Sequence, residues 1–406
     1  MSDFKQTGAI TTLHKLPGYS LENIEDQLRK HAKRQPMTLI LPSLFSELEG
    51  PALKGILDEL KGADYINEIV IGLDQATEEQ FEYAKEFFAC LPQKKKILWN
   101  DGPNMRAIAD DLEARGLGPK EAGKGRNVWY CLGYILAAGN SKAVALHDCD
   151  ILTYTRDIPA RLFYPIVNPA LDFEFCKGYY TRVNDRGQLS GRVTRLFVQP
   201  LFSSLKKILG NTEYLEFMDA FRYPLSGEFS FSTDLLNAIR IPSDWGLEVG
   251  ILSEAYRNTT QRRICQVDIA DNYDHKHQQM GEADRQDGLS RMSYEIAKAV
   301  FRKLGTEGTI MDGAFFRALK AVYLREALDM LERYDADAHM NCLSLDIHAE
   351  EKTIEFFSGS ILDAGEKYLE SPRETPFIPN WMRVMSAEPD LGDRILSAVE
   401  LDNQSA

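Results

Sequence analysis

The sequence predicts a doubly wound α/β protein, and three observations support this fold class. Four short, nearly continuous apolar strands alternate with helical stretches in residues 1–150, a pattern typical of a parallel sheet covered by helices on both faces. The chain has 406 residues, which suggests two or three domains, or one large domain with an extension. Hydrophobic residues make up 44% and charged residues 27% of the chain, which argues against wholesale disorder and against a fibrous protein.

The expected elements follow in chain order. A polar lead-in, residues 1–35, holds one helix at about 21–33. The first half contains expected strands at 37–41, 68–72, 96–99 and 143–147, with helices at about 50–60, 77–89, from 104 onward, and from about 126 to 138. The middle part mixes expected strands at 173–177 and 264–269 with helices at about 193–208 and 247–258. Amphipathic helices follow at 289–304 and 313–333, and prolines in the last 30 residues predict a tail that wraps or dangles.

The net charge and the lack of targeting signals in the sequence limit the classes of protein that we consider. The net charge of −14 argues against a general nucleic-acid binder and requires any phosphate site to be built from a few local cations or a metal. We find no apolar run long enough for a transmembrane helix and no signal peptide. The six cysteines are scattered and none forms a C-x-x-C pair, so we expect reduced thiols and a cytoplasmic protein.

The sharpest chemical feature is Asp148-Cys149-Asp150, which directly follows the fourth expected strand. Ligands bind at the carboxyl ends of strands in this architecture. Two carboxylates at i and i+2 suit a hard cation that would bind a nucleotide diphosphate, although an ordinary strand-end turn fits the pattern equally well. The second D-x-D match, Asp335 and Asp337, follows a long helix, and we interpret it as structural.

Two segments that precede expected helices could bind anions. Gly123-Lys124-Gly125-Arg126 combines flexible glycines with two cations at a helix start, but a plain loop would have the same composition. Ser190-Gly191-Arg192-Val193-Thr194-Arg195 offers two guanidinium groups, a hydroxyl and backbone N–H groups for a phosphate or carboxylate. A capped, solvent-facing helix start is the alternative for this second segment.

Two acids and a histidine pair complete the candidates. Glu228 and Glu248 each lie beside glycines, which would let a substrate approach the backbone closely, although either could be a surface acid or a cap. His275 and His277 follow the strand expected at 264–269, and one of them could complete a metal site with Asp148 and Asp150. A solvated histidine is the alternative.

Taken together in chain order, these segments resemble the retaining glucosyl-3-phosphoglycerate synthases, glycosyltransferases of family 81. The resemblance covers about residues 36–305 and includes Pro42-Ser43-Leu44, Gln199-Pro200-Leu201 and Gly246-Leu247-Glu248-Val249-Gly250 beside the segments above. It implies a GT-A fold, with a Rossmann-like nucleotide-sugar half at 36–155, an acceptor half at 156–305 and a helical C-terminal extension at 306–406. It also favours a homodimer.

The resemblance implies a role for each matching residue. Metal ligands would be Asp150 and His275, holding Mg²⁺, Mn²⁺ or Co²⁺. Catalytic residues would be Glu248, Asp150 and Arg192, and the acceptor would be bound by Gly191, Arg192, Val193 and Thr194. Donor-binding residues would be Pro42, Ser43, Leu44, Glu47, Asp74, Lys124, Asp148 and Glu228. The chain departs from the family pattern after the first strand, where Phe45-Ser46 precedes Glu47, and after the second, which reads Gly72-Leu73-Asp74-Gln75.

The implied reaction is metal-dependent transfer of glucose from UDP- or GDP-glucose to the 2-hydroxyl of 3-phosphoglycerate, with retention of configuration, for synthesis of a glucosylglycerate-type compatible solute. Glycerate as the acceptor, or mannose as the donated sugar, is the nearest alternative. A sugar nucleotidyltransferase shares the α/β layout, but it would carry a glycine-rich basic loop where this chain has Pro42-Ser43-Leu44-Phe45.

Overall fold

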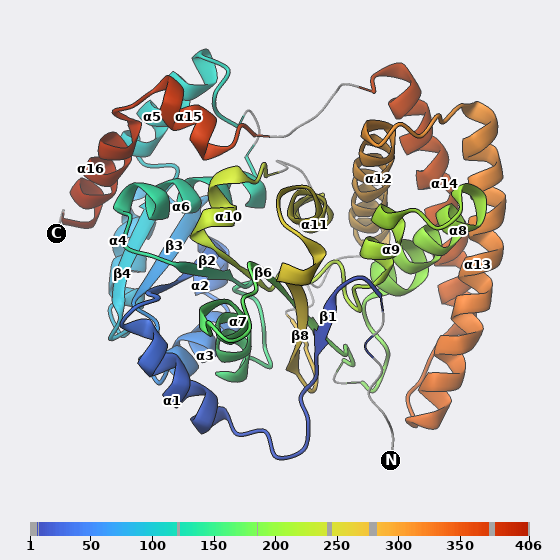
Figure 1. Cartoon of the computed structure of the whole chain (residues 1–406), viewed down its shortest axis with the longest axis horizontal. Coiled ribbons are helices and arrows are strands. Elements are labelled where there is room, and N and C mark those ends of the chain that lie inside the picture. The colour runs from blue at the N-terminus through green and yellow to red at the C-terminus, as the bar shows by residue number, and fades with distance from the viewer. Residues whose placement is uncertain are drawn as a thin grey trace.

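A computed structural model describes residues 6, 8–119, 122–184, 186–241, 246–275, 282–372 and 378–404, and of residues 282–287 it describes the backbone alone. Figure 1 shows an α/β part built around one sheet and, beside it, a bundle of long helices. The predicted α/β class is confirmed.

The sheet has eight strands in the order β1-β8-β6-β7-β5-β2-β3-β4. All neighbours pair in parallel except β7, which runs antiparallel to β5 and β6. The sheet is therefore mixed and not purely parallel as the apolar strands suggested. Strand bounds are β1 Thr11–Leu13, β2 Met37–Leu44, β3 Glu68–Asp74, β4 Lys94–Trp99, β5 Ala143–Leu146, β6 Phe175–Tyr180, β7 Phe229–Ser232 and β8 Ile264–Ala270.

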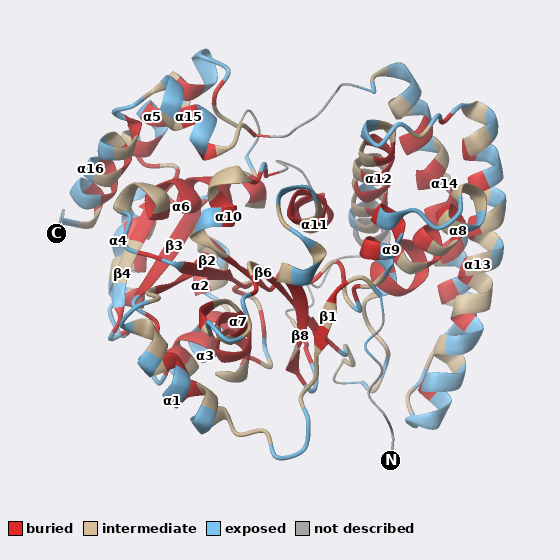
Figure 2. Cartoon of the chain, in the orientation of Figure 1, coloured by how far each residue is buried: buried red, intermediate tan, exposed pale blue. Residues whose placement is uncertain are grey.

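Two buried cores lie on opposite faces of the sheet, because successive strand residues point to opposite faces. In β2, Leu39 and Leu41 join one core and Ile40 joins the other. The six strands between the edges are buried along nearly their whole length (Figure 2), which explains their near-continuous apolar sequences, whereas the edge strands β1 and β4 are partly exposed.

Helices cover both faces. The first core is shared by α1 Leu21–Ala32, α2 Phe45–Leu48, α3 Pro51–Leu60, α4 Glu78–Phe88 and α7 Asp157–Val167. The second is shared by α5 Pro103–Ala114, α6 Lys124–Ala138, α10 Thr233–Ala238 and α11 Leu247–Asn258, and it continues into the helical bundle. A short 3₁₀ helix, Gln261–Arg263, leads into β8.

The bundle joins helices from two distant parts of the sequence. It contains α8 Gln199–Leu209, α9 Glu213–Asp219, α12 Glu282–Thr306, α13 Gly313–Met340 and α14 Ile347–Glu370 (Figure 1). A π-helical turn, Val193–Val198, leads into α8 and packs against α12, α13 and α14. The segment expected to bind an acceptor therefore lies at the junction between the sheet and the bundle.

Three details differ from the sequence-based expectations. The lead-in contributes β1, which pairs with β8 at the sheet edge. The proline-containing tail wraps back over the α/β part and forms two helices, α15 Trp381–Ala387 and α16 Leu391–Gln404, because Trp381 stacks on Trp129 and α16 packs on α5 and α6. Asp335 and Asp337 lie within α13 and not after it, since that helix continues to Met340.

Candidate active site

The predicted site residues meet at one edge of the sheet because the carboxyl ends of β2, β3 and β5 lie together there. The antiparallel strand β7 begins at the same edge, with Phe229 paired to Leu146. This register brings Glu228, just before β7, next to Asp148, just after β5. The Asp148 backbone N–H points toward Glu228 Oε1 at 3.5 Å.

Lys124 bridges two predicted site carboxylates. Its Nζ lies 2.6 Å from Asp148 Oδ1 and 3.2 Å from Glu248 Oε1. Lys124 is the first residue of α6, and Glu248 lies in the first turn of α11. Burial alone would raise the pKa of Asp148, but the charge and hydrogen bond of Lys124, together with the charges of His275 and His147, outweigh burial and lower that pKa. Gly227 makes room for this pair, since a Cβ there would lie 2.5 Å from Asp148 Oδ2. Asp148 and Glu248 are therefore held in place before any ligand arrives.

Glu228 lies beneath this pair and is fully buried. It accepts hydrogen bonds from Tyr180 at 2.9 Å, Tyr273 at 2.7 Å and Ser226 at 2.9 Å. Burial, together with the negative charge of Asp148, raises its pKa. With no exposed surface and both oxygens engaged, Glu228 supports the loop of Asp148, and the donor-binding role implied by the resemblance stays a prediction.

Asp150 and His275 come together as the sequence predicted for metal ligands. Asp150 Oδ2 and His275 Nδ1 are 3.9 Å apart. Arg182 contacts His275 Nε2, and its Nη1 donates to the Tyr223 hydroxyl at 3.2 Å. Within the described ranges, no group of three or more His, Cys, Asp or Glu side chains is arranged to hold a metal ion, so an ion here would need oxygens from a ligand or water. His277, the other candidate, lies outside the described residues.

The end of β2 is more regular than expected. Pro42, Ser43 and Leu44 continue the strand and pair with β3 instead of forming a loop. Ser43 is buried, whereas Leu44 is exposed at the rim. The Glu47 carboxylate accepts the Leu44 backbone N–H at 3.1 Å. Burial raises the pKa of Glu47 to about 7, and the negative charge of Asp148 adds to the effect.

Asp74, at the end of β3, lies beside Arg126, a candidate from the sequence, and beside Asn100, which the sequence did not single out. Its Oδ1 accepts from Asn100 at 2.8 Å and lies 3.6 Å from Arg126 Nη2. Asn127 donates to the Gly72 carbonyl at 2.8 Å, and a Cβ on Gly72 would lie 1.8 Å from the Asn127 side chain. Polar groups thus surround the β3 end, next to β2, although the sequence departs from the family pattern there.

The predicted acceptor segment begins at a glycine in the left-handed region. Gly191 has φ of +76°, and a Cβ there would lie 3.0 Å from the Tyr223 hydroxyl. Val193 points into the core, so it could contact a ligand only through its backbone. The Thr194 hydroxyl is buried and finds no hydrogen-bond partner among the described residues. Arg192 remains 43% exposed at its side chain and pairs with Glu350 of α14.

Lys177, on β6, is a buried cation that the sequence analysis missed. Lys177 is two residues from Phe175 on β6, so both side chains point to the same face of the sheet. Lys177 is 1% exposed, and its Nζ is 5.1 Å from the centre of the Phe229 ring. Within the described part of the chain, Nζ has no hydrogen-bond partner. Burial lowers its pKa to about 8, although the charges of Glu248 and Glu228 oppose this effect. A lysine in an apolar strand was the only signal available in the sequence.

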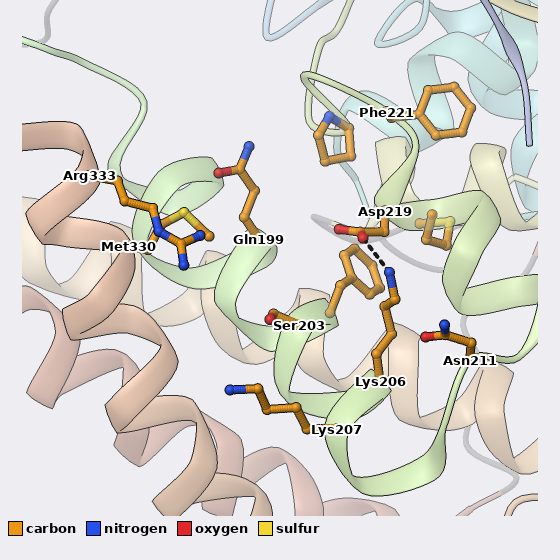
Figure 3. A pocket seen from close by; sticks show the side chains of 12 residues that line it. Gln199, Ser203, Lys206, Lys207, Asn211, Asp219, Phe221, Met330 and Arg333 are labelled. Carbon is orange, nitrogen blue, oxygen red and sulfur yellow. Dashed lines mark hydrogen bonds and ion pairs between the residues drawn. The ribbon is translucent and has the colours of Figure 1, made fainter. Parts of the chain in front are cut away.

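A cavity of about 410 Å³ lies behind the acceptor segment, between α8, α9 and α13 (Figure 3). Basic side chains line it, but Lys206 pairs with Asp219 at 2.7 Å and Lys207 pairs with Glu326. None of the predicted donor, acceptor or metal residues lines this cavity. The predicted site residues therefore gather at the sheet edge and not around this hollow.

The mixed sheet, with a D-x-D sequence after β5 and an antiparallel strand β7 beside it, defines a glycosyltransferase of the GT-A class. Solved structures agree with this fold. Mannosyl-3-phosphoglycerate synthase from Rubrobacter xylanophilus superposes with a TM-score of 0.55 at 21% identity, covering 74% of this chain and 83% of that chain. Glucosyl-3-phosphoglycerate synthase from Mycobacterium tuberculosis, solved with phosphoglyceric acid, gives 0.52 at 21% identity, covering 75% and 90%.

Curated relatives identify the family. A glucosyl-3-phosphoglycerate synthase from Persephonella marina (strain DSM 14350 / EX-H1) is 47% identical over 403 residues, 99% of both chains. Another, from Methanococcoides burtonii (strain DSM 6242 / NBRC 107633 / OCM 468 / ACE-M), is 39% identical over 97% of this chain and 96% of its own length. No protein-family model matches. The chain belongs to the glucosyl-3-phosphoglycerate synthase family and is a glycosyltransferase.

Proposed function

We propose that this protein transfers glucose from a nucleoside diphosphate glucose to the 2-hydroxyl of 3-phosphoglycerate, with a divalent cation and with retention of configuration. One continuous set of contacts supports the proposal best. His275, beside Asp150, contacts Arg182, which donates to Tyr223, and Tyr223 packs against Gly191 of the acceptor segment. In this proposal the residues that would bind the metal and the acceptor border the same space, as a transferase with two substrates requires.

The donor would lie along the ends of β2, β3 and β5. In this proposal, Leu44 and Asp74 contact the nucleoside and Asp148 the ribose, with Glu47 fixing the chain after β2. Lys124 is placed beside the diphosphate, where its positive charge offsets negative charge on the leaving group. The helix α6 begins at Lys124, so its N-terminal N–H groups lie beside the same region and would favour an anion there.

The residues present fit a divalent cation. Asp150 supplies a carboxylate oxygen and His275 an imidazole nitrogen, and their separation of 3.9 Å allows one ion to contact both. The carboxylates of Asp148 and Glu47 add negative charge around Asp150 that such an ion would neutralise. When bound, Mg²⁺ or Mn²⁺ would stabilise the charge that develops on the departing diphosphate.

Arg192 and the backbone around Gly191 and Thr194 would orient the acceptor. This binding would hold the 2-hydroxyl of the acceptor close to the donor sugar. Glu248 faces the sugar side of Lys124 in this proposal, but its pairing with that lysine makes it a poor nucleophile. We therefore favour attack from the same face that the leaving group departs from. The new C1–O bond forms as the C1–O bond to phosphate breaks, and a phosphate oxygen takes the proton of the 2-hydroxyl.

A substrate matrix tests this proposal. Purified protein is incubated with UDP-glucose, GDP-glucose or GDP-mannose against 3-phosphoglycerate or glycerate, with Mg²⁺, Mn²⁺, Co²⁺ or a chelator. We expect metal-dependent formation of a glucosylated phosphoglycerate, from UDP-glucose or GDP-glucose. Products only from glycerate or only from GDP-mannose would instead support the alternatives left open by the sequence, and no product in any combination would reject the proposal.

A single substitution tests the metal site. Asp150→Ala removes a carboxylate whose side chain is 33% exposed and not part of the core, so we expect folded protein. Turnover should fall by more than about 100-fold, because loss of even the residues that orient metal ligands costs about 10–100-fold. Circular dichroism checks the fold. Full activity of this variant in chelator-treated buffer would contradict the assignment.

We also propose the cytoplasm as its location, where phosphorylated acceptors are available. None of the described helices is both long and apolar enough to cross a membrane. The homodimer suggested by the family resemblance stays a prediction, which light scattering of the purified protein would check.

A further inference from the structure

Glu350, on α14 of the C-terminal bundle, contacts the acceptor segment from outside the α/β part. Its Oε1 lies 2.7 Å from Arg192 Nε, and its Oε2 lies 3.0 Å from Arg195 Nη2. The Glu350 side chain is 2% exposed. One buried carboxylate, 158 residues away from Arg192 in the sequence, therefore holds both arginines of this segment.

The two arginines differ in what else they contact. Arg195 is 8% exposed at its side chain, donates through Nε to the Ser190 carbonyl at 2.9 Å and lies 5.0 Å from the centre of the Tyr334 ring. It is a fixed structural cation. Arg192 is 43% exposed, and the single contact found for it among the described residues uses Nε. Its two terminal nitrogens, the outer edge of the guanidinium, therefore remain accessible.

A guanidinium group is planar and can bind one anion at each of two edges. A carboxylate at the Nε side fixes the plane and leaves the Nη1–Nη2 edge for a second anion. Because a free arginine side chain samples many rotamers, this restraint prepares Arg192 before the acceptor binds. The charges also suit an anionic acceptor, since two arginines and one glutamate leave a net positive charge.

We propose that Glu350 is a positioning residue of the acceptor site, which holds Arg192 by its Nε edge so that the outer edge binds the phosphate or carboxylate of the acceptor. This inference rests on the proposed function for the identity of the acceptor. It also gives the C-terminal bundle a role in the reaction, because α14 supplies a side chain without which the acceptor segment is incomplete.

Further contacts from the bundle fix the same segment. The Tyr323 hydroxyl, on α13, donates to the Leu196 carbonyl at 2.7 Å, and Phe357, on α14, packs on Phe197 with ring centres 5.3 Å apart. These contacts hold the π-helical turn independently of Glu350. A change at Glu350 should therefore alter the orientation of Arg192 while the backbone of the turn stays in place.

A competing interpretation predicts the opposite sign. If Glu350 only occupied Arg192 and had to be displaced by the acceptor, its removal would free the arginine and lower the acceptor KM. If it positions Arg192, removal of its charge should raise the acceptor KM, because Arg192 loses its fixed orientation and faces an uncharged amide.

The experiment compares Glu350→Gln with the wild type and with Glu355→Gln, an exposed glutamate on the same helix. For Glu350→Gln we expect the KM for 3-phosphoglycerate to rise about tenfold or more, with the donor KM changed less than twofold and the circular dichroism spectrum retained. Glu355→Gln should match the wild type. An unchanged or lower acceptor KM in Glu350→Gln, or an equal rise in both KM values, would overturn the proposal.

A double-mutant cycle asks whether Glu350 acts through Arg192. In an Arg192→Ala background, Glu350→Gln should have no further effect on the acceptor KM, and a full additional effect would overturn the proposal. Arg192→Lys gives an independent test should Glu350→Gln fail to fold. Lysine keeps the charge but lacks a second edge, so the acceptor KM should rise, and a wild-type KM would refute the two-edge geometry.

Binding measurements separate this inference from the proposed function. If the wild type transfers no glucose to 3-phosphoglycerate, the proposed function fails by itself. Isothermal titration of wild type and Glu350→Gln with 3-phosphoglycerate then tests the positioning role without turnover. We expect about tenfold weaker binding to the variant, and equal affinities would overturn the inference.

Discussion

Replacing Lys177 with methionine should stabilise the protein at neutral pH. Lys177 is 1% exposed, and no hydrogen-bond partner for its Nζ occurs in the described part of the chain. Burial lowers its pKa to about 8, although charges on neighbouring elements, Glu248 of α11, Glu228 before β7 and Asp148 after β5, favour the charged form, and Lys124 of α6 opposes it. Desolvation therefore outweighs the nearby carboxylates, and the charged side chain destabilises the folded state.

The pKa difference gives the size and the pH window of this effect. Relative to the ordinary lysine value of 10.5, a folded-state pKa of about 8 corresponds to about 3 kcal/mol of lost stability at pH 7. Between pH 8 and 10.5, Lys177 keeps its proton in the unfolded chain but has lost it in the folded one. The cost is therefore complete below pH 8 and disappears as the pH rises through 10.5, falling to about 1 kcal/mol at pH 10. Methionine has a similar volume, so repacking costs about 1 kcal/mol.

Urea unfolding of wild type and Lys177→Met at pH 7 and pH 10 measures the difference. We expect the variant to be more stable by about 2 kcal/mol at pH 7 and nearly equal to the wild type at pH 10. Lys54→Met, at an exposed position of α3, is the control and should differ little from the wild type at either pH. A variant that is no more stable at pH 7, or a difference that is the same at both pH values, would refute the reasoning.

Two further substitutions test packing around the site and its outer support. Gly72→Ala should lower the free energy of unfolding by about 1–3 kcal/mol, because the new Cβ would lie 1.8 Å from Asn127. Gly55→Ala, with nothing within 4 Å, should instead stabilise α3, and equal effects in urea unfolding would contradict this. Trp381→Ala should cost about 3–5 kcal/mol, because Trp381 is 2% exposed and stacks on Trp129. The 61% exposed Met382 should tolerate alanine in the same thermal unfolding assay, and a small loss for Trp381→Ala would show that the tail is not needed for stability.

The α/β layout and the position of Asp148 and Asp150 could be predicted because they depend on local patterns. Apolar strand residues and helical periodicity mark the elements, and the chain order of the strands puts their ends at one edge. The meeting of Asp150 with His275 was also expected, although the sequence left His277 as an alternative and the family resemblance alone favoured His275. Both residues lie at the same edge because β8 and β5 belong to one sheet.

Other parts of the site depend on contacts between distant segments, which one sequence does not reveal. Glu350 belongs to an amphipathic helix with many other acids, and nothing local distinguishes it from Glu355. Its burial follows from packing of α14 against α12 and α13. Likewise, β7 runs antiparallel because of the path of the chain through the bundle, and this direction puts Glu228 under Asp148. The two tail helices were missed because prolines suggest irregular chain, whereas α15 begins at Trp381 between Pro379 and Pro389 and α16 begins at Leu391 after the last proline.

The opposite charges at the two ends of the site argue that it binds two different ligands. At the donor end, burial and the negative charges of Asp148 and Glu47 raise the pKa of Asp150. The positive charge of Lys124 opposes this effect. Such an end needs a cation before it can accept a diphosphate. The acceptor end has the opposite imbalance, since Arg192 and Arg195 share the single charge of Glu350. Under the proposed function, a chain with a net charge of −14 would therefore attract two phosphorylated substrates, one through a metal ion and the other through arginines oriented by the C-terminal bundle.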